Sequence, residues 1–248
     1  MSNWLFPDRD ASGAEAAGAA ADPDLDPAEA DVDPDAVDVD PLDASTVAPG
    51  TSVLVVGPPM TGKRRLLFDL VGGSASRTAA FVTTKKRADR MRAWFRATRP
   101  DEEVWDLSFV DCSGSRGGLG GGNGVEVTDL RRVSSPGDLT GIGIELTGIL
   151  RRWHHDDVTD PRVGLHSLST LLMYADVKRI YQFLHVVTTR IATVDGVGVF
   201  TMDVSPRGDT ADVLTHLFDA LVQVRDGSDG PEFRVRGREF GPRSWTDF

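Results

Sequence analysis

The sequence predicts a three-layer α/β domain in which helices cover both faces of a mostly parallel sheet. Three observations support this fold class. Short apolar runs, typical of buried strands, alternate with longer segments whose apolar residues recur at helical spacing. The first apolar run ends in a glycine-containing turn that leads directly into a helix. About 200 residues follow an acidic N-terminal stretch, which is enough for one domain with a substantial core.

The elements follow one another in a regular alternation. Strands are expected at 52–56, 79–83, 104–111, 162–165, 197–202 and 220–224, with a last one at 233–237. Helices are expected at 64–71, 86–98, 139–154, 177–194 and 210–217. Asp138 is a suitable N-cap for the third helix. Residues 113–124 contain 7 glycines and predict a mobile loop. The aromatic and basic stretch 233–248 predicts either an edge hairpin or a subunit contact.

The net charge of −11 is concentrated at the N-terminus. Residues 1–46 hold 13 of the 38 acidic residues and 1 of the 27 basic residues, so their net charge is −12 and that of the remainder is +1. Repeated Asp-Pro and Val-Asp steps bury too little apolar area to offset chain entropy. We therefore expect a disordered acidic tail at 1–46 and a folded domain at 47–248. The apolar triplet at 4–6 is either a frayed end or a short anchor.

Several classes of protein are excluded. The single cysteine, Cys112, rules out an intramolecular disulfide framework and suits a reducing compartment. The N-terminus lacks a secretory signal, and no apolar run is long enough to span a membrane. We expect a cytoplasmic protein with no membrane partner. Arginine and aspartate outnumber lysine and glutamate, a composition that suggests a salt-adapted organism.

The strongest local signal is a phosphate-binding loop at 57–64. Its sequence, GPPMTGKR, matches the first seven positions of the pattern G-x-x-x-x-G-K-[ST]. In such a loop, backbone N–H groups and the start of a helix face a phosphate, and Lys63 adds a positive charge. The eighth position is Arg64, which cannot ligate Mg²⁺ as a hydroxyl would. The expected nucleotide-binding residues are Gly57, Pro58, Pro59, Met60, Thr61, Gly62, Lys63, Arg64 and Arg65.

With this loop in place, the chain resembles the KaiC-like branch of the RecA-superfamily ATPases. It looks most like poorly characterised RecA-like proteins of salt-loving archaea. The resemblance covers about residues 51–225 and rests on the order of several segments. These are GPPMTGKRRLL, AAFVTTKKRADRM, SPGDLTGIGIELTGIL, RVGLHSLSTLLMYADVKRIYQFLHVVTTRI, VGVFTMDVS and DVLTHLFDALVQVR. It implies a RecA-like P-loop domain that binds ATP.

The resemblance also implies catalytic residues that this chain lacks. The Walker B aspartate of the branch matches His166, and the catalytic glutamate that follows its second strand matches Lys85. The site therefore gains positive, or potentially positive, charge at Arg64, Lys85 and His166. In a competing register, Asp203 is the Walker B residue and could hold a metal. In the preferred register, Asp203 lies at the rim of the site and no residue is assigned to a metal.

These features predict a regulatory or scaffolding protein that binds ATP or another nucleoside polyphosphate. Hydrolysis would be weak or absent, and Mg²⁺ would be largely dispensable, because Arg64 and Lys85 replace part of its charge. One alternative is an active ATPase in DNA repair, recombination or signalling that uses Asp203. Another alternative is a protein-interaction module that has lost nucleotide binding.

A basic segment at 85–99 bears on partners. It holds seven positive charges, at Lys85, Lys86, Arg87, Arg90, Arg92, Arg96 and Arg99. Three interpretations remain open: a solvated helical face, a docking site for an acidic protein or for the chain's own tail, and a nucleic-acid contact. The loop at 113–124 has one base and no aromatic residue, which disfavours nucleic acid. The resemblance also leaves a homo-oligomer open.

Overall fold

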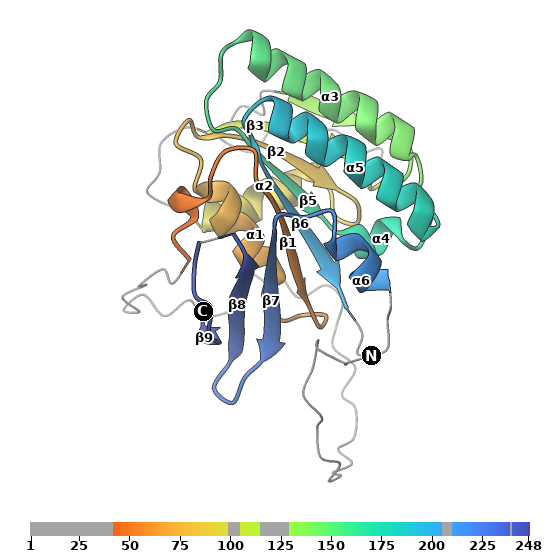
Figure 1. The fold of residues 1–248 in the computed structure, drawn as a ribbon. Helices are drawn as coiled ribbons and strands as arrows, with labels where there is room; N and C mark the ends of the chain where they lie inside the picture. The colour runs from red at the N-terminus through yellow and green to blue at the C-terminus, as the bar shows by residue number, and fades with distance from the viewer. Residues whose placement is uncertain (1–41, 99–104, 115–128, 205–209, 239) are drawn as a thin grey trace. The chain divides into compact units, whose positions relative to one another are not determined.

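The described part of the chain is built around a nine-stranded sheet (Figure 1). This computed structural model describes residues 42–98, 105–114, 129–204, 210–238 and 240–248. The strand order is β4-β3-β2-β5-β6-β1-β7-β8-β9. All neighbours from β4 to β7 are parallel, whereas β8 and β9 join antiparallel to one edge. The predicted α/β class with a mostly parallel sheet is confirmed.

The seven expected strands are present, with small shifts at their ends. The strands are β1 Ser52–Gly57, β2 Thr78–Thr83, β3 Asp106–Asp111, β4 Asp129–Arg132, β5 Arg162–His166, β6 Val197–Asp203, β7 Ala220–Asp226, β8 Pro231–Gly237 and β9 Thr246–Asp247. The sequence did not predict β4. The C-terminal stretch forms an edge hairpin, because β8 pairs with both β7 and β9.

Helices form a layer on each face of the sheet (Figure 1). On one face lie α1 Lys63–Gly72 and α2 Ala88–Ala97, whose apolar residues join the main hydrophobic core. On the other face α3 Leu139–His155 packs beside α5 Val177–Thr193. Two short helices, α4 Leu168–Leu171 and α6 Thr210–Thr215, complete the set within the described residues. Asp138 caps α3 as predicted, since its carboxylate accepts a hydrogen bond from the Gly141 N–H at 2.8 Å.

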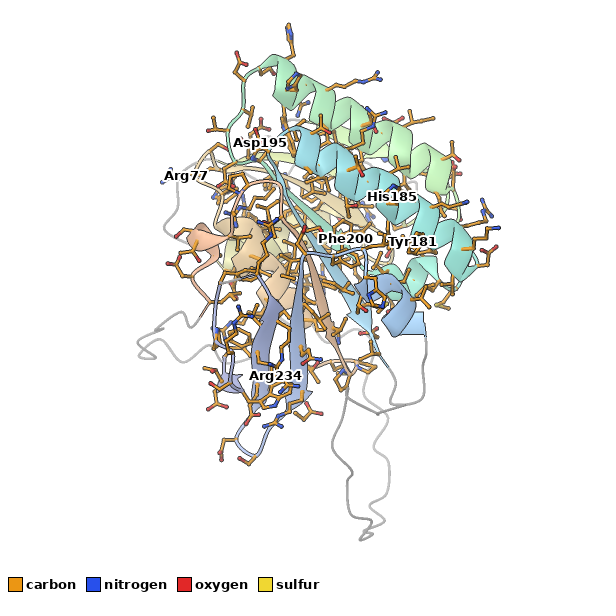
Figure 2. The ribbon with its side chains drawn as sticks, in the orientation of Figure 1. Arg77, Tyr181, His185, Asp195, Phe200 and Arg234 are labelled. Atoms are coloured by element: carbon orange, nitrogen blue, oxygen red, sulfur yellow. The ribbon has the colours of Figure 1, made fainter. Side chains whose placement is uncertain are left out.

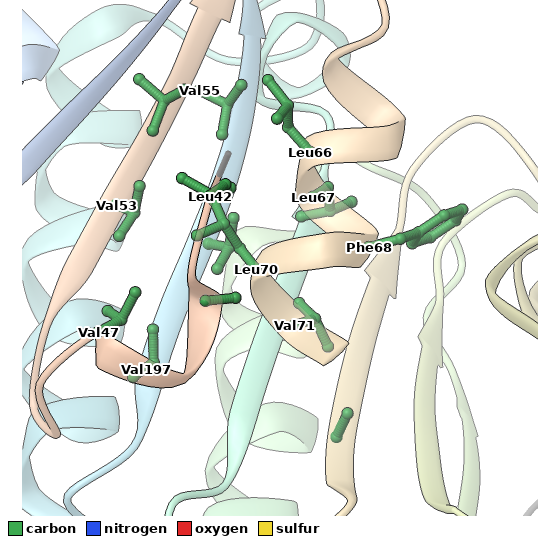
Figure 3. Packing of buried hydrophobic residues seen from close by; sticks show 14 of the residues in the cluster. Leu42, Val47, Val53, Val55, Leu66, Leu67, Phe68, Leu70, Val71 and Val197 are labelled. Atoms are coloured by element: carbon green, nitrogen blue, oxygen red, sulfur yellow. The ribbon is translucent and has the colours of Figure 1, made fainter. Parts of the chain in front are cut away.

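The core that supports the start of α1 is packed between this helix and the sheet (Figure 3). Every residue of β1 is buried, as expected for a strand covered on both faces. Its Val53 and Val55 face Leu66 and Leu70 of α1 (Figure 3). The turn that joins β1 to α1 is therefore held at both ends by buried apolar side chains.

The predicted boundary at residue 46 is wrong by about five residues. A short 3₁₀ helix, η2, spans Ala44–Thr46, and the Leu42 side chain is only 1% exposed. Leu42 packs among the residues of β1 and α1 (Figure 3). The guanidinium of the fully buried Arg162 donates a hydrogen bond of 2.8 Å to the Ala44 carbonyl. A few apolar residues in this mostly acidic stretch pack into the core. The net charge of the stretch gave no indication of this packing.

Other expectations fall wholly or partly beyond the described residues. The tail prediction for residues 1–41 lies outside them, as do most of the predicted loop at 113–124 and Arg99. The helix predicted to start at residue 86 starts at Ala88, whose N–H donates to the Asp111 carboxylate at 3.0 Å. Among the helices that the structure describes, none is both long and apolar enough to cross a membrane.

Candidate phosphate-binding site

The predicted loop lies at the carboxyl end of β1 and leads directly into α1. β1 ends at Gly57, and Gly62 is the N-cap of α1 with a φ of 77°, in the left-handed region that favours glycine. No side chain caps this helix. The Arg65 N–H donates to the Gly62 carbonyl at 2.8 Å, so the N–H groups of Lys63 and Arg64 are the ones left for a ligand, and the helix dipole favours an anion there. Met60 at the loop tip is fully exposed.

The Lys63 side chain folds back over the loop. It is only 6% exposed, and its ammonium donates to the Pro58 carbonyl. The same Nζ lies 2.9 Å from a carboxylate oxygen of Asp203 and 3.5 Å from the Thr61 hydroxyl. The lysine that would bind a phosphate is thus held at the loop by oxygen atoms of the protein itself.

Asp203 lies closer to the loop than the preferred sequence register implied. β6 pairs directly with β1, and in this strand pairing Asp203 lies opposite Gly57. Its N–H donates to the Ser169 hydroxyl at 2.7 Å, which ties it to α4. Its side chain is 43% exposed and ion-paired with Lys63. Asp203 is partly exposed, as expected at the rim of the site. Its carboxylate nevertheless contacts the loop lysine, Lys63.

His166 ends β5, which is separated from β1 by β6. Its Nδ1 lies 2.9 Å from the Thr201 hydroxyl. Burial lowers the pKa of His166 to about 4; the charges of Arg64, Lys63 and Lys85 contribute, and Asp203 opposes them. His166 is therefore neutral at pH 7, so the potential positive charge noted at this position is not present there.

The ends of β2 and β5 are joined by a small hydrogen-bonded group centred on Thr84. Its N–H and its hydroxyl both donate to the His166 carbonyl, at 3.1 and 3.0 Å. In return, the Ser167 N–H donates to the Thr84 hydroxyl at 2.9 Å. The next residue, Lys85, is exposed. The structure thus places Lys85 and His166 at neighbouring strand ends.

Arg64 stacks on an aromatic ring. Its guanidinium carbon lies 3.9 Å from the centre of the Trp94 ring in α2, and that of Arg90 lies 5.4 Å from the same centre. Burial, and then the charge of Arg90, lower the pKa of Arg64. The side chain is therefore held toward α2 by a cation–π contact. No sequence signal indicated this contact, because Arg64 and Trp94 lie in different helices.

Potential metal ligands are sparse around the loop. No group of three or more His, Cys, Asp or Glu residues comes together in the described ranges. Asp203 contacts the loop lysine, but its carboxylate is already paired. The ammonium group of Lys63 and the N–H groups at the start of α1 are donors that suit phosphate oxygens.

The basic segment does not form one helical face. Lys85, Lys86 and Arg87 precede α2, and Arg87 pairs with Asp89 at 3.0 Å. Arg90 is exposed, whereas Arg92 and Arg96 are half-buried. Of this segment, Lys85 and Arg90 are the charges that act on groups of the loop site.

A cavity of about 660 Å³ lies elsewhere, between α3 and α5. Its lining includes Arg131, Arg151, Arg179 and Arg190 around apolar residues such as Ile144. None of the residues predicted for the nucleotide site lines it. It is therefore separate from the loop.

The comparisons with known proteins support the fold and identify the family. A solved structure of a KaiC-like protein from the hyperthermophilic archaeon Pyrococcus horikoshii is similar, with a TM-score of 0.52 and 15% sequence identity. The similarity covers 77% of this chain and 81% of that one, and at this identity it indicates a shared RecA/KaiC-like fold alone. No curated protein matches the sequence. The model of a family of unknown function, DUF7504, matches residues 50–224, and the chain belongs to this family.

Proposed function

We propose that the protein binds ATP or another nucleoside polyphosphate at the loop Gly57–Lys63 and acts as a regulatory or scaffolding protein with weak or no hydrolysis. The observation that carries this proposal is the buried Lys63 at the uncapped start of α1, beside a loop that leaves β1. The RecA/KaiC-like fold is consistent with nucleotide binding in general. The sequence of the loop indicates where on this fold the phosphates are proposed to bind.

The surrounding charges support binding with little need for Mg²⁺. Burial is the main cause of the lowered pKa of His166, and the charges of Arg64, Lys63 and Lys85 add to it, so three cations lie near this residue. A triphosphate normally arrives with Mg²⁺ because the metal neutralises its charge. At this loop, fixed cations supply part of that neutralisation.

Weak hydrolysis is inferred because the two described positions at which the resemblance implies catalytic carboxylates, Lys85 and His166, hold none. Attack by water needs a group that accepts or orients its proton. Lys85 stands where the resemblance implies a glutamate, and a protonated lysine cannot accept a proton. His166 is neutral, but with its pKa lowered to about 4 it is a poor base at pH 7.

A second candidate is an active ATPase that uses Asp203 to hold a metal. The specific observation in its favour is that Asp203 lies opposite Gly57 and contacts Lys63. On this reading, a bound phosphate would draw Lys63 away and free the carboxylate for Mg²⁺. The proposals that an acidic partner or nucleic acid docks on the basic segment 85–99 are independent of this choice.

Replacing the loop lysine tests the proposal. Lys63→Ala removes the cation nearest the loop, and charge-assisted contacts to phosphate are the strong ones. We expect affinity for ATP to fall about 10- to 100-fold, which corresponds to about 1.4–2.7 kcal/mol. The measurement is the rise in melting temperature of the wild type and the variant across an ATP series.

The matched control is Lys178→Ala, which removes an exposed lysine at the start of α5. It should leave the ATP-induced rise unchanged. If the wild type shows no rise with any nucleotide, the chain is an interaction module that does not bind nucleotide. If Lys63→Ala keeps the full rise, binding occurs away from the loop.

A further inference from the structure

The C-terminal hairpin brings an aromatic ring to the phosphate loop. β9 pairs with β8 at Phe233 opposite Thr246, and Phe248 follows directly. The Phe248 ring contacts Phe233 edge-to-face, with 5.3 Å between the ring centres. A Cβ atom added to Gly62 would lie 2.9 Å from two carbons of the Phe248 ring. The ring therefore packs against the loop backbone at the residue that precedes Lys63.

Several contacts fix the segment that carries this ring. The Trp245 ring lies beside two guanidinium groups of the hairpin, 4.2 Å from that of Arg225 and 4.3 Å from that of Arg234. Arg234 lies on β8 in Figure 2. The Val235 N–H donates to the Pro242 carbonyl at 2.7 Å, and Phe240 is buried. The ring thus has a set position before any ligand arrives.

Residues of the C-terminal hairpin form an apolar surface beside the loop at Gly62. A Cβ atom at Gly62 would also lie 4.0 Å from Pro231, so Pro231 and Phe248 border the same glycine. Phe248 is half-buried, which leaves part of its ring open to solvent. An apolar surface does not bind a phosphate, because phosphate oxygens need N–H or cationic donors. An aromatic ring suits the π-face of a nucleotide base.

We propose that Phe248 is the platform on which the base of a bound nucleoside polyphosphate stacks while its phosphates occupy the loop Gly57–Lys63. This inference rests on the proposed function and extends it, because it selects nucleotides over bare polyphosphates. Stacking accepts any base but favours larger rings. The ligand class is therefore a nucleoside polyphosphate, with purines preferred over pyrimidines. Phe248 and the hairpin residues lie beyond the part of the chain that the family model matches.

The test compares two ligands that share a triphosphate and differ in the base. Dissociation constants for ATP and for inorganic tripolyphosphate are measured calorimetrically on the full chain and its variants. Phe248→Leu keeps an apolar side chain against Gly62 and Phe233 but cannot stack. We expect ATP affinity to fall about tenfold and tripolyphosphate affinity to change less than about twofold. Phe248→Trp should keep the wild-type preference for ATP.

A matched control is Phe218→Leu. Phe218 is also half-buried and also contacts one other ring, that of Phe200, at 5.2 Å. It precedes β7, whereas the loop follows the other end of the parallel strand β1, so its replacement should affect neither ligand. Melting temperatures of all variants show whether each is folded.

The outcomes separate the two proposals. If the wild type binds ATP but Phe248→Leu binds it equally well, the platform is refuted and the proposed function stands. If both ligands weaken together, the ring shapes the loop rather than binding the base, and the platform is again refuted. If the wild type binds neither ligand, the proposed function fails and the platform with it.

Discussion

At the residue scale, the contact between Lys63 and Asp203 governs how a phosphate would enter the loop. The two side chains are 2.9 Å apart, and the lysine also donates to the Pro58 carbonyl. An incoming phosphate would compete with these oxygens for the same ammonium group. Its negative charge would also approach the Asp203 carboxylate. We therefore expect Asp203 to weaken the proposed phosphate binding unless a metal ion bridges the two groups.

Replacing Asp203 distinguishes the proposed binding protein from the active ATPase. Asp203→Asn keeps the size of the side chain but removes its charge, which frees Lys63 and removes the repulsion. Because Asp203 is partly exposed, the gain is modest. We expect affinity for ATP in the absence of Mg²⁺ to rise about three- to tenfold, measured by calorimetry.

In the active-ATPase alternative, Asp203→Asn should lower the affinity for ATP instead of raising it. There Asp203 holds the metal, so Asp203→Asn would weaken binding of Mg²⁺-ATP and stop phosphate release. Asn is a matched replacement, and Asp219→Asn is a control at the other end of the sheet, where Asp219 accepts from the Ser52 N–H at 2.9 Å. Weaker ATP binding in Asp203→Asn, with the control unchanged, would contradict the proposed metal-independent binding.

The sequence predicted the loop itself because all its determinants are local. A strand, the spacing of Gly57, Gly62 and Lys63, and a helix lie within about twenty consecutive residues. The partners of these residues are distant in sequence. Asp203 meets Lys63 because β6 pairs with β1, and before the structure only the resemblance placed Asp203 at or near the site. The lowered pKa of His166 likewise depends first on burial and then on neighbouring charges, and only the fold produces both.

At the element scale, predictions succeeded where apolar periodicity was strong and failed for short or polar elements. The long helices α3 and α5 begin where the sequence indicated, because Asp138 and Asp176 cap them. β4 reads Asp-Leu-Arg-Arg and has no apolar alternation, so pairing with β3 alone makes it a strand. The four residues of α4 are too few for a helical period to be seen.

The segment before β1 is the element whose role the sequence most understated. Leu42 is fully enclosed by the core beneath α1 (Figure 3), so its truncation would leave a cavity. We expect Leu42→Ala to lower the free energy of unfolding by about 2–4 kcal/mol, measured by urea denaturation.

The exposed neighbour Ser45 provides the control for this prediction. Ser45→Ala lies in the same short helix, η2, and should change the free energy of unfolding by no more than about 0.5 kcal/mol. If Leu42→Ala were as stable as Ser45→Ala, Leu42 would not belong to the core in solution. The boundary predicted at residue 46 would then be restored.

At the scale of the whole molecule, charge is separated along the chain. Of the 38 acidic residues, 13 lie in residues 1–46, and the remaining 202 residues are almost neutral. Around the loop, three cations act on one histidine, and one exposed carboxylate contacts the loop lysine. A net charge of −11 would suggest a protein that repels polyanions. The cations around the loop instead support the proposed polyanionic ligand.

The dependence of ATP affinity on Mg²⁺ is the most direct test of whether fixed cations replace the metal at the loop. Dissociation constants are measured by calorimetry with Mg²⁺ and with EDTA at the same ionic strength, because salt screens exposed charges. We predict that the two constants agree within about threefold and that phosphate release stays below about one per minute. A loss of affinity of about 100-fold or more in EDTA, together with faster turnover, would contradict this prediction.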